Sequence, residues 1–241
     1  MKWFESWFDT PYYHALYQHR NEAEAAAFMD RLVSHLGLSP GMRVLDVACG
    51  KGRHSAYLAS KGLQVWGLDL SENSIRIARE LGVARATFAV HDMRVAYPVP
   101  AMAAVFNLFT SFGYFDDPAE DARVLVNMAE ACEEQGYVVQ DYLNAASVLD
   151  HLPQEAELMR GGYTFVTRKY RTATHIVKDI EVRDGDAVFH FQEQVRIFDL
   201  ETLLGLHESA GLKVLDVFGD DQLGAFDAKV SPRMVVVSQK S

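Results

Sequence analysis

Hydrophobic positions near the start of the chain repeat at the spacing of an α-helix. Between Glu22 and Leu36, apolar side chains recur three and four positions apart, and Gly37 and Pro40 follow directly. This period predicts an amphipathic helix that ends before Gly37. Upstream, residues 3–17 are dense in aromatic side chains. We expect residues 1–40 to form a helical cap on a single domain that spans residues 1–241.

From residue 43 onward, short apolar runs alternate with helical stretches. The apolar runs, each expected to be a strand, are 43–48, 64–70, 86–90, 102–109, 136–142, 212–218 and 234–238. Helices are expected at 53–60, after Ser71, at 118–134 and after Asp199. Strands that alternate with helices indicate a parallel sheet with helices on both faces. The pattern therefore predicts an α/β fold with a doubly wound, mostly parallel, seven-stranded Rossmann-like sheet.

The pattern changes after the fifth strand. Residues 162–171, 174–183 and 187–198 resemble three long strands without helices between them, and Asp184-Gly185 is typical of a tight hairpin. We expect an inserted antiparallel sheet at about 160–198, serving either as a lid or as a dimer contact. Asp179 and Glu181 give one strand an acidic face, which favours a cationic or amine acceptor.

Composition and charge narrow the class of protein. The net charge of -10 disfavours a polyanionic partner, so no nucleic acid is expected. Cys49 and Cys132 are too few for a disulfide framework, which favours a cytoplasmic location. No window approaches the roughly 18 apolar residues of a membrane span, and Met1–Asp9 lacks the features of a signal peptide. We expect no membrane partner and no metal.

The strongest local signal lies between the first predicted strand and the helix after it. Asp46 ends the strand, and Gly50 and Gly52 remove side chains where a ligand would approach the backbone. The next strand ends in Asp69, which could accept hydrogen bonds from both hydroxyls of a ribose. Ligands of open α/β sheets bind at these strand ends. The alternative is a generic strand-helix-strand unit with an acid at a strand end.

Two ligands compete for this loop, a dinucleotide and S-adenosylmethionine. The dinucleotide fingerprint requires a third glycine or alanine, and Ser55 occupies that place. Asp46 would repel a pyrophosphate but suits a ligand with an amino group and a sulfonium. After the third strand, Asp92 could bond an adenine amino group and Met93 could cover the ring, although Asp92 alone could be a turn residue. The sequence therefore favours S-adenosylmethionine as cofactor.

These elements together resemble the class I S-adenosylmethionine-dependent methyltransferases. Residues 45–52 match the glycine-rich loop of that family, with Ala48 in place of its first glycine, and residues 69–71 and 91–94 match its ribose and adenine loops. The resemblance covers the whole chain. It is greatest for small-molecule enzymes, including amino-sugar N,N-dimethyltransferases and glycine N-methyltransferase-like proteins. The Tyr-rich segment 12–17, the segment 108–115 and the insertion carry it.

The resemblance implies a set of cofactor contacts. In such relatives, a tyrosine and an arginine of the first helix contact the cofactor, which implies Tyr13 and Arg20 here, with Tyr17 as a further candidate. Arg20 would bond the methionine carboxylate, or else it is a solvated helix charge. The full set expected to bind the cofactor is Tyr13, Tyr17, Arg20, Asp46, Ala48, Cys49, Gly50, Gly52, Asp69, Leu70, Asp92, Met93 and Asn107.

The implied reaction is in-line methyl transfer to a small-molecule acceptor. The alternatives are a methyltransferase of RNA or protein, a non-catalytic binding module, and an oxidoreductase on the same fold. A base is needed only if the nucleophile arrives protonated. Weak candidates are His54, Tyr114, Asp141, Tyr142 and His151, each of which could instead be structural. A homodimer is possible, through the insertion or through the aromatic cluster at residues 3–8.

Overall fold

The structure is a computed structural model of the chain, and it describes residues 2–17, 22–149, 152 and 154–241. Arg20 and His151, both candidates from the sequence, lie outside the described residues. No helix in the described ranges is long and apolar enough to cross a membrane.

Seven strands form the main sheet. They are β1 Arg43–Val47, β2 Gln64–Asp69, β3 Ala86–Val90, β4 Met102–Asn107, β5 Cys132–Leu143, β10 Leu212–Phe218 and β11 Arg233–Lys240. Their order is β10-β11-β5-β4-β1-β2-β3. The first five strands are parallel, whereas β11 pairs antiparallel with β5, and β10 antiparallel with β11. The predicted doubly wound, mostly parallel sheet is confirmed.

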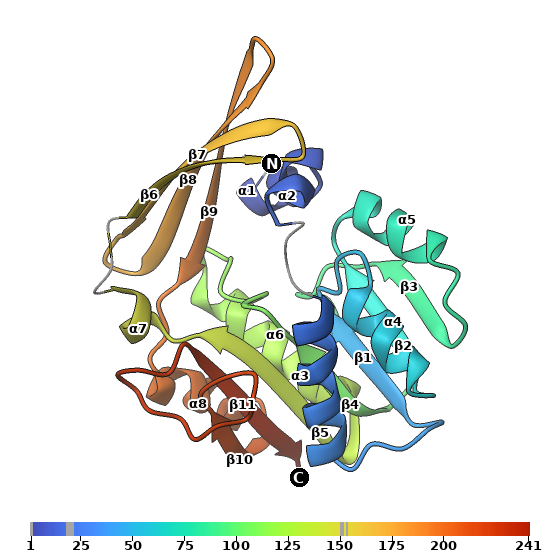
Figure 1. Cartoon of the computed structure of the whole chain (residues 1–241). Coiled ribbons are helices and arrows are strands. Elements are labelled where there is room, and N and C mark those ends of the chain that lie inside the picture. The colour runs from blue at the N-terminus through green and yellow to red at the C-terminus, as the bar shows by residue number, and fades with distance from the viewer. Residues whose placement is uncertain (1, 18–21, 150–151, 153) are drawn as a thin grey trace.

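Helices cover both faces of this sheet (Figure 1). They are α3 Glu22–His35, α4 Arg53–Ser60, α5 Glu72–Glu80, α6 Pro118–Ala131 and α8 Leu200–Ser209, with a short α7 at Ala145–Leu149. α3 and α4 pack on one face, and α6 and α8 on the other. The expected caps are present, because the Ser71 hydroxyl accepts the Ser74 N–H and the Asp199 carboxylate accepts the Thr202 N–H.

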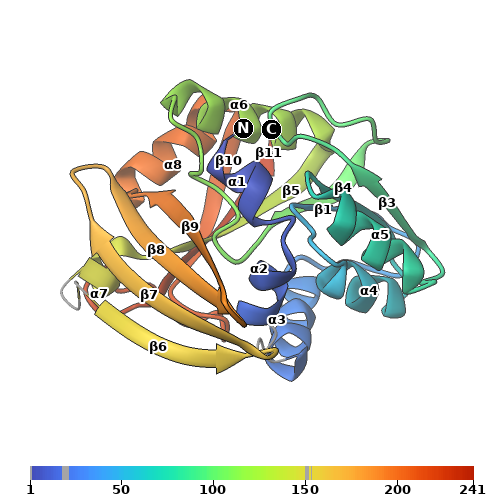
Figure 2. The same cartoon turned by 90° about the horizontal axis from the view of Figure 1, so that it is seen from above.

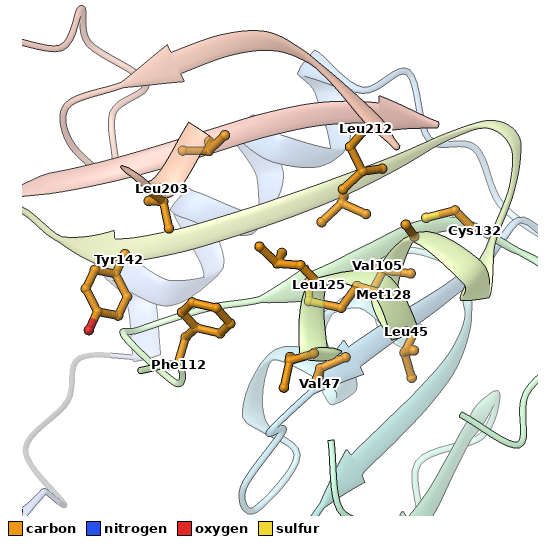
Figure 3. Packing of buried hydrophobic residues seen from close by; sticks show 14 of the residues in the cluster. Leu45, Val47, Val105, Phe112, Leu125, Met128, Cys132, Tyr142, Leu203 and Leu212 are labelled. Carbon is orange, nitrogen blue, oxygen red and sulfur yellow. The ribbon is translucent and has the colours of Figure 1, made fainter. Parts of the chain in front are cut away.

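The core explains the continuous apolar run of β4. Its Val105 packs with Leu45, Leu125 and Met128 in the cluster of Figure 3, whereas the adjacent Phe106 belongs to the cluster under α3 and α4. A strand buried on both faces needs apolar residues at every position. β4 ends two residues before the sequence prediction, because Phe109 and Thr110 have positive φ angles and turn the chain away.

A second, four-stranded antiparallel sheet is inserted between β5 and α8. Its strands are β6 Gln154–Arg160, β7 Tyr163–Arg171, β8 His175–Asp184 and β9 Ala187–Arg196, in the order β6-β7-β8-β9. The sequence pattern predicts only three strands in this region, and β6 was not predicted. That segment, Gln-Glu-Ala-Glu-Leu-Met-Arg, is an exposed edge strand without apolar alternation, so its pairing with β7 left little pattern to find.

Two short helices pack on the inner face of this insertion. They are α1 Trp3–Trp7 and α2 Pro11–Leu16. Trp7 and Leu16 are buried against Phe165, Ile180 and Val182 of the second sheet. Seen from above in Figure 2, α1 and α2 lie between the second sheet and the helices α4 and α5. The aromatic N-terminus therefore joins the insertion to the main domain.

Candidate active site

Two adjacent cavities open at the carboxyl ends of β1, β2 and β4. We call the first, of about 810 Å³, the motif cavity, because the loops after β1, β2 and β3 line it. We call the second, of about 970 Å³, the sheet cavity, because β6–β9 of the second sheet form much of its wall. The residues that line both are Phe8, Tyr13, Tyr17, Ala25, Arg53, Phe109, Ser111 and Tyr114.

The glycine-rich loop after β1 has the backbone that close ligand approach requires. Ala48, Gly50 and Gly52 have φ angles of 60°, 55° and 78°. A Cβ on Gly50 would meet nothing within 4 Å, so its backbone borders open space in the motif cavity. Ala48 adopts the left-handed conformation without being glycine, which costs about 1–2 kcal/mol. Such strain at a cavity wall is typical of a functional loop.

Gly52 has a different role from the expected one. It lies outside the lining of the motif cavity, and a Cβ there would come within 2.8 Å of the Phe88 ring of β3. A Cβ on Gly67 of β2 would meet the same ring at 2.6 Å. The missing side chain of Gly52 makes room for Phe88 beneath α4, so packing alone accounts for a glycine at this position.

Asp69 accepts hydrogen bonds from the loop after β1 and from the residue that caps α5. Its Oδ2 accepts the Gly50 N–H at 2.8 Å, and its Oδ1 accepts the Ser71 N–H at 2.8 Å. Burial raises the pKa of Asp69 above its usual range. A carboxylate has about four acceptor positions, so Asp69 can still receive ribose hydroxyls on its cavity side. Leu70 and Cys49 line the motif cavity beside it.

Asp46 lies buried at the end of β1 and lines the motif cavity. The Ser55 hydroxyl donates to Asp46 Oδ2 at 2.6 Å. Ser55 is the residue that stands in place of the third glycine of the dinucleotide fingerprint. Burial raises the pKa of Asp46 to about 7, and the charge of Asp69 adds to this. A cationic ligand beside Asp46 would therefore favour its ionised form.

Asp92 and Met93 both line the motif cavity after β3. Both oxygens of Asp92 accept bonds from the Arg94 guanidinium, the shortest at 2.6 Å, and Arg94 also bonds Glu120 at 2.6 Å. Burial opposes the charge of Asp92, but the bonds from Arg94 outweigh it and lower the pKa of Asp92. Oδ1 also accepts the Arg94 N–H, so Asp92 is a turn residue as well as a cavity residue.

Asn107 does not line either cavity. It is fully buried at the end of β4, where its amide donates to the carbonyl oxygens of Val47 and Ser111 at 3.3 and 3.0 Å. Its expected contact with the cofactor therefore has no support from the cavity lining. Asn107 instead joins the end of β1 to the loop after β4, which the sequence could not show because that loop folds back on itself.

The N-terminal segment contributes more cavity residues than expected. Tyr13 and Tyr17 line both cavities, and Phe4, Phe8 and His14 line the motif cavity as well. Burial, with a smaller effect from the charge of Lys51, lowers the pKa of His14 to about 4. The aromatic density of residues 3–17 was the only sequence signal for Phe4, Phe8 and His14.

Two of the proposed bases line a cavity. The His54 ring stacks on Phe109 at 4.9 Å and 13° and lines the motif cavity only. Tyr114 lines both cavities, and its hydroxyl donates to the Thr110 carbonyl oxygen at 2.8 Å. His151, the fifth candidate, lies outside the described residues.

Asp141 and Tyr142, the other two described candidates, lie in structural surroundings. Both are completely buried outside the two cavity linings, and burial raises the pKa of each. Asp141 accepts the Phe109 N–H at 2.8 Å and pairs with Arg233, and the Tyr142 hydroxyl donates to the Arg196 carbonyl oxygen at 2.7 Å. Their complete burial and their partners became visible only in the fold.

The wall shared by the two cavities centres on a strained turn. Phe109 and Thr110 have φ angles of 57° and 60°. The guanidinium carbons of Arg53 and Arg233 lie 5.3 and 4.7 Å from the centre of the Phe109 ring. Non-glycine residues in this conformation cluster at functional sites.

The second sheet presents two lysines and Glu193 to the sheet cavity, but not the acidic face of β8. Lys169 and Lys178 line it, whereas Asp179 and Glu181 point to the opposite face of β8. The argument for a cationic acceptor from the acidic strand face is therefore wrong, because that face lies away from the cavity. No group of three or more His, Cys, Asp or Glu that could hold a metal occurs in the part of the chain that the structure describes.

Comparisons with known proteins agree with this geometry. A family model described as a methyltransferase domain matches residues 38–195. A dTDP-3-amino-3,4,6-trideoxy-alpha-D-glucopyranose N,N-dimethyltransferase of Streptomyces venezuelae is 34% identical over 179 residues, covering 71% of this chain and 75% of that protein. A Geobacillus relative and a Bordetella parapertussis ubiquinone biosynthesis O-methyltransferase are 27% and 37% identical. These matches cover 53% and 41% of their lengths, so the chain spans about half the length of these relatives.

Solved structures show the same fold. Streptomyces venezuelae DesVI superposes with a TM-score of 0.72 at 26% identity, over 95% of this chain and 97% of that chain. An S-adenosylmethionine-dependent methyltransferase from Clostridium acetobutylicum superposes with a TM-score of 0.81 at 16% identity, over 95% and 96%. The chain therefore belongs to the methyltransferase-domain family, among the S-adenosylmethionine-dependent methyltransferases of this fold.

Proposed function

We propose that this chain transfers a methyl group from S-adenosylmethionine in the motif cavity to a small molecule in the sheet cavity. The wall shared by the two cavities carries the proposal, because ligands on its two sides lie next to each other. Bound S-adenosylmethionine supplies a methyl carbon that is already activated. The protein then has to align the acceptor atom, the methyl carbon and the sulfur, and such alignment can lower the barrier by roughly 7–11 kcal/mol.

The residues of the motif cavity fit that cofactor. Asp69 offers acceptor positions for the ribose, and Asp92 with Met93 offers a polar edge and an apolar surface for the adenine. Asp46 suits the amino group, and the open space at Gly50 lets the ligand approach the backbone. Tyr13 and Tyr17, which line both cavities, would close the cofactor from the N-terminal side.

The acceptor we propose is an amine on a sugar-sized molecule. The Streptomyces venezuelae relative is named as an N,N-dimethyltransferase of an amino sugar linked to dTDP. A cavity of about 970 Å³ is at the upper end of the range for small-molecule sites. At the shared wall, the Tyr114 hydroxyl is oriented by its bond to the Thr110 carbonyl oxygen. In this proposal, the Tyr114 hydroxyl orients the acceptor nitrogen.

The proposal also covers the class of substrate, the location and the oligomeric state of the enzyme. A net charge of -10 opposes a nucleic-acid substrate, and the two buried free cysteines suit the cytoplasm. Residues 2–17 and the second sheet together act as a roof over the cavities. A homodimer contact through the outer face of the second sheet is the alternative role, which sedimentation of the purified chain distinguishes.

Calorimetry followed by a turnover assay tests the function. S-adenosylmethionine and S-adenosylhomocysteine should bind, and NAD should not. With labelled cofactor, the label should pass to amino sugars and leave RNA and protein unlabelled. Asp69→Ala should weaken cofactor binding at least tenfold, since bonds to a charged acceptor are worth about 1.5–3 kcal/mol each. NAD binding without a response to either methionine derivative, or labelled RNA or protein, would refute the proposal.

A further inference from the structure

One row of side chains across the second sheet differs from the rows beside it. The strand register aligns Gln154 with Lys169, Lys169 with Lys178, and Lys178 with Glu193. All four residues line the sheet cavity. The next row on the same face is mostly apolar and consists of Ala156, Thr167, Ile180 and Phe191. We call the first of these rows the polar row.

The two lysines of the polar row are placed unfavourably for the protein alone. They lie directly opposite each other on neighbouring strands, and like charges in that position are destabilising. Both are half-buried. Burial lowers the pKa of Lys169, and the charge of Lys178 lowers it further. The charge of Glu193, on the far side of Lys178, offsets only part of this effect.

The other two charged members of the polar row, Lys178 and Glu193, already have partners. Glu193 accepts the indole N–H of Trp7 at 2.6 Å and the Tyr17 hydroxyl at 2.7 Å. Lys178 donates to the Tyr17 oxygen at 3.0 Å. The Lys169 ammonium, in contrast, has no hydrogen bond or ion pair to any residue that the structure describes. It is therefore the cation with most to gain from a ligand.

The charge of the cavity contrasts with that of the whole protein. Among the described residues, four basic side chains line the sheet cavity, Arg53, Lys169, Lys178 and Arg233, against three acidic ones, Glu24, Glu193 and Asp221. The chain as a whole carries a net charge of -10. The described lining is thus of mixed sign with a small basic excess, whereas the whole protein is acidic. An anionic group is therefore less disfavoured in this cavity than on the average surface of the protein.

We propose that Lys169 and Lys178 form a subsite for a phosphoryl group carried by the methyl acceptor. This rests on the proposed function, because the subsite lies in the cavity assigned to the acceptor. Two ammonium groups match the charge of a phosphoryl dianion, and lysine binds phosphate as a point charge, whereas bidentate carboxylate recognition favours arginine. The subsite would hold the acceptor by a group other than the nitrogen that is methylated.

Inorganic pyrophosphate is the probe for this subsite, with binding followed by calorimetry on the full chain. Wild type should bind it saturably, and Lys169→Met, which keeps the apolar stem, should weaken the binding at least tenfold. Lys213→Met is the matched control, because Lys213 is an exposed strand lysine of β10, and it should bind as wild type does. Malonate at the same concentrations tests the carboxylate alternative.

Folding and cofactor binding serve as internal controls. Lys169→Met should melt at or above the wild-type temperature, because it removes one of two opposed charges, and Lys169→Gln is the second variant. S-adenosylhomocysteine should bind to Lys169→Met within about twofold of wild type, because Lys169 lies outside the motif cavity. Equal pyrophosphate binding by wild type and both Lys169 variants, or tighter binding of malonate, overturns the subsite. Loss of cofactor binding by wild type would instead overturn the proposed function.

Discussion

The backbone N–H of Phe109 donates a 2.8 Å hydrogen bond to the buried carboxylate of Asp141. The next N–H, that of Thr110, donates to the backbone oxygen of the same aspartate at 2.9 Å. Arg233 pairs with the Asp141 carboxylate and also lies over the Phe109 ring. One buried acid thus holds two residues with positive φ at the wall between the cavities, so we assign Asp141 a structural role.

Replacing Asp141 with asparagine should destabilise the fold without removing a catalytic group. Removing one partner of a buried ion pair costs up to 3–5 kcal/mol, and partial exposure of Arg233 reduces this to about 2–4 kcal/mol. Urea denaturation of Asp141→Asn measures the loss. Asp186→Asn, on an exposed hairpin, should change the free energy of unfolding by less than about 0.5 kcal/mol. A variant with wild-type stability but no turnover would restore Asp141 as a candidate base.

The sequence predicted the main sheet because its strands are apolar runs separated by glycines and helix caps. It missed β6 because an exposed edge strand needs no apolar face. It grouped Asp46, Asp69 and Asp92 correctly, since the carboxyl ends of parallel strands meet at one edge. For these three acids, the position at or just after a strand end was sufficient to bring them to one cavity.

The sequence could not separate cavity residues from core residues with the same chemistry. Asp141 and Tyr142 lie near the carboxyl end of β5 just as Asp69 lies at the end of β2, yet they bond to Arg233 and Arg196, 92 and 54 positions further along the chain. Gly52 fits the glycine loop, but its Cβ would strike a ring of β3. Such assignments depend on tertiary neighbours that no local pattern specifies.

The two loop glycines should respond differently to substitution. Gly52→Ala should cost roughly 2–4 kcal/mol of stability, because it adds a left-handed alanine and a clash with Phe88. Phe88→Leu in the same chain should recover part of this loss. Gly50→Val should instead raise the dissociation constant of S-adenosylhomocysteine at least tenfold, with a smaller fall in melting temperature. A Gly52→Ala protein as stable as wild type that fails to bind would return Gly52 to the cofactor site.

His207 should make stability depend on pH. Its ring lies buried between the Gln140 side chain and the Ser238 hydroxyl at 2.9 Å each, and burial lowers its pKa from 6.5 to about 4. Between these values the unfolded chain binds a proton that the folded chain excludes, so stability falls as pH drops from 6.5 towards 4. The full effect is about 3 kcal/mol, and it is constant below pH 4.

Comparison of variants isolates this effect from other titrating groups. Urea unfolding at several pH values between 4 and 7 should show a shallower fall for His207→Gln than for wild type. His190→Gln, on an exposed position of β9, should keep the wild-type slope. Identical slopes for wild type and His207→Gln would mean that His207 is not neutral in the folded protein.

Asp46 should link cofactor binding to proton release. Because its pKa is raised to about 7 by burial, about half of the free protein carries this group protonated at pH 7. The ammonium of S-adenosylmethionine favours the ionised carboxylate. Binding should therefore release about half a proton at pH 7, and the dissociation constant should rise up to tenfold per unit as pH falls below 7.

Calorimetry at pH 6, 7 and 8, in pairs of buffers with different ionisation enthalpies, counts these protons. Adenosine, which lacks the methionine ammonium, should show a much weaker pH dependence with the same protein. Asp46→Asn should bind S-adenosylmethionine more weakly and with a flat profile. His14 lines the same cavity, but its pKa of about 4 keeps it out of this pH range. If Asp46→Asn kept the wild-type pH profile, the released proton would come from another group, and Asp46 would face a neutral part of the ligand.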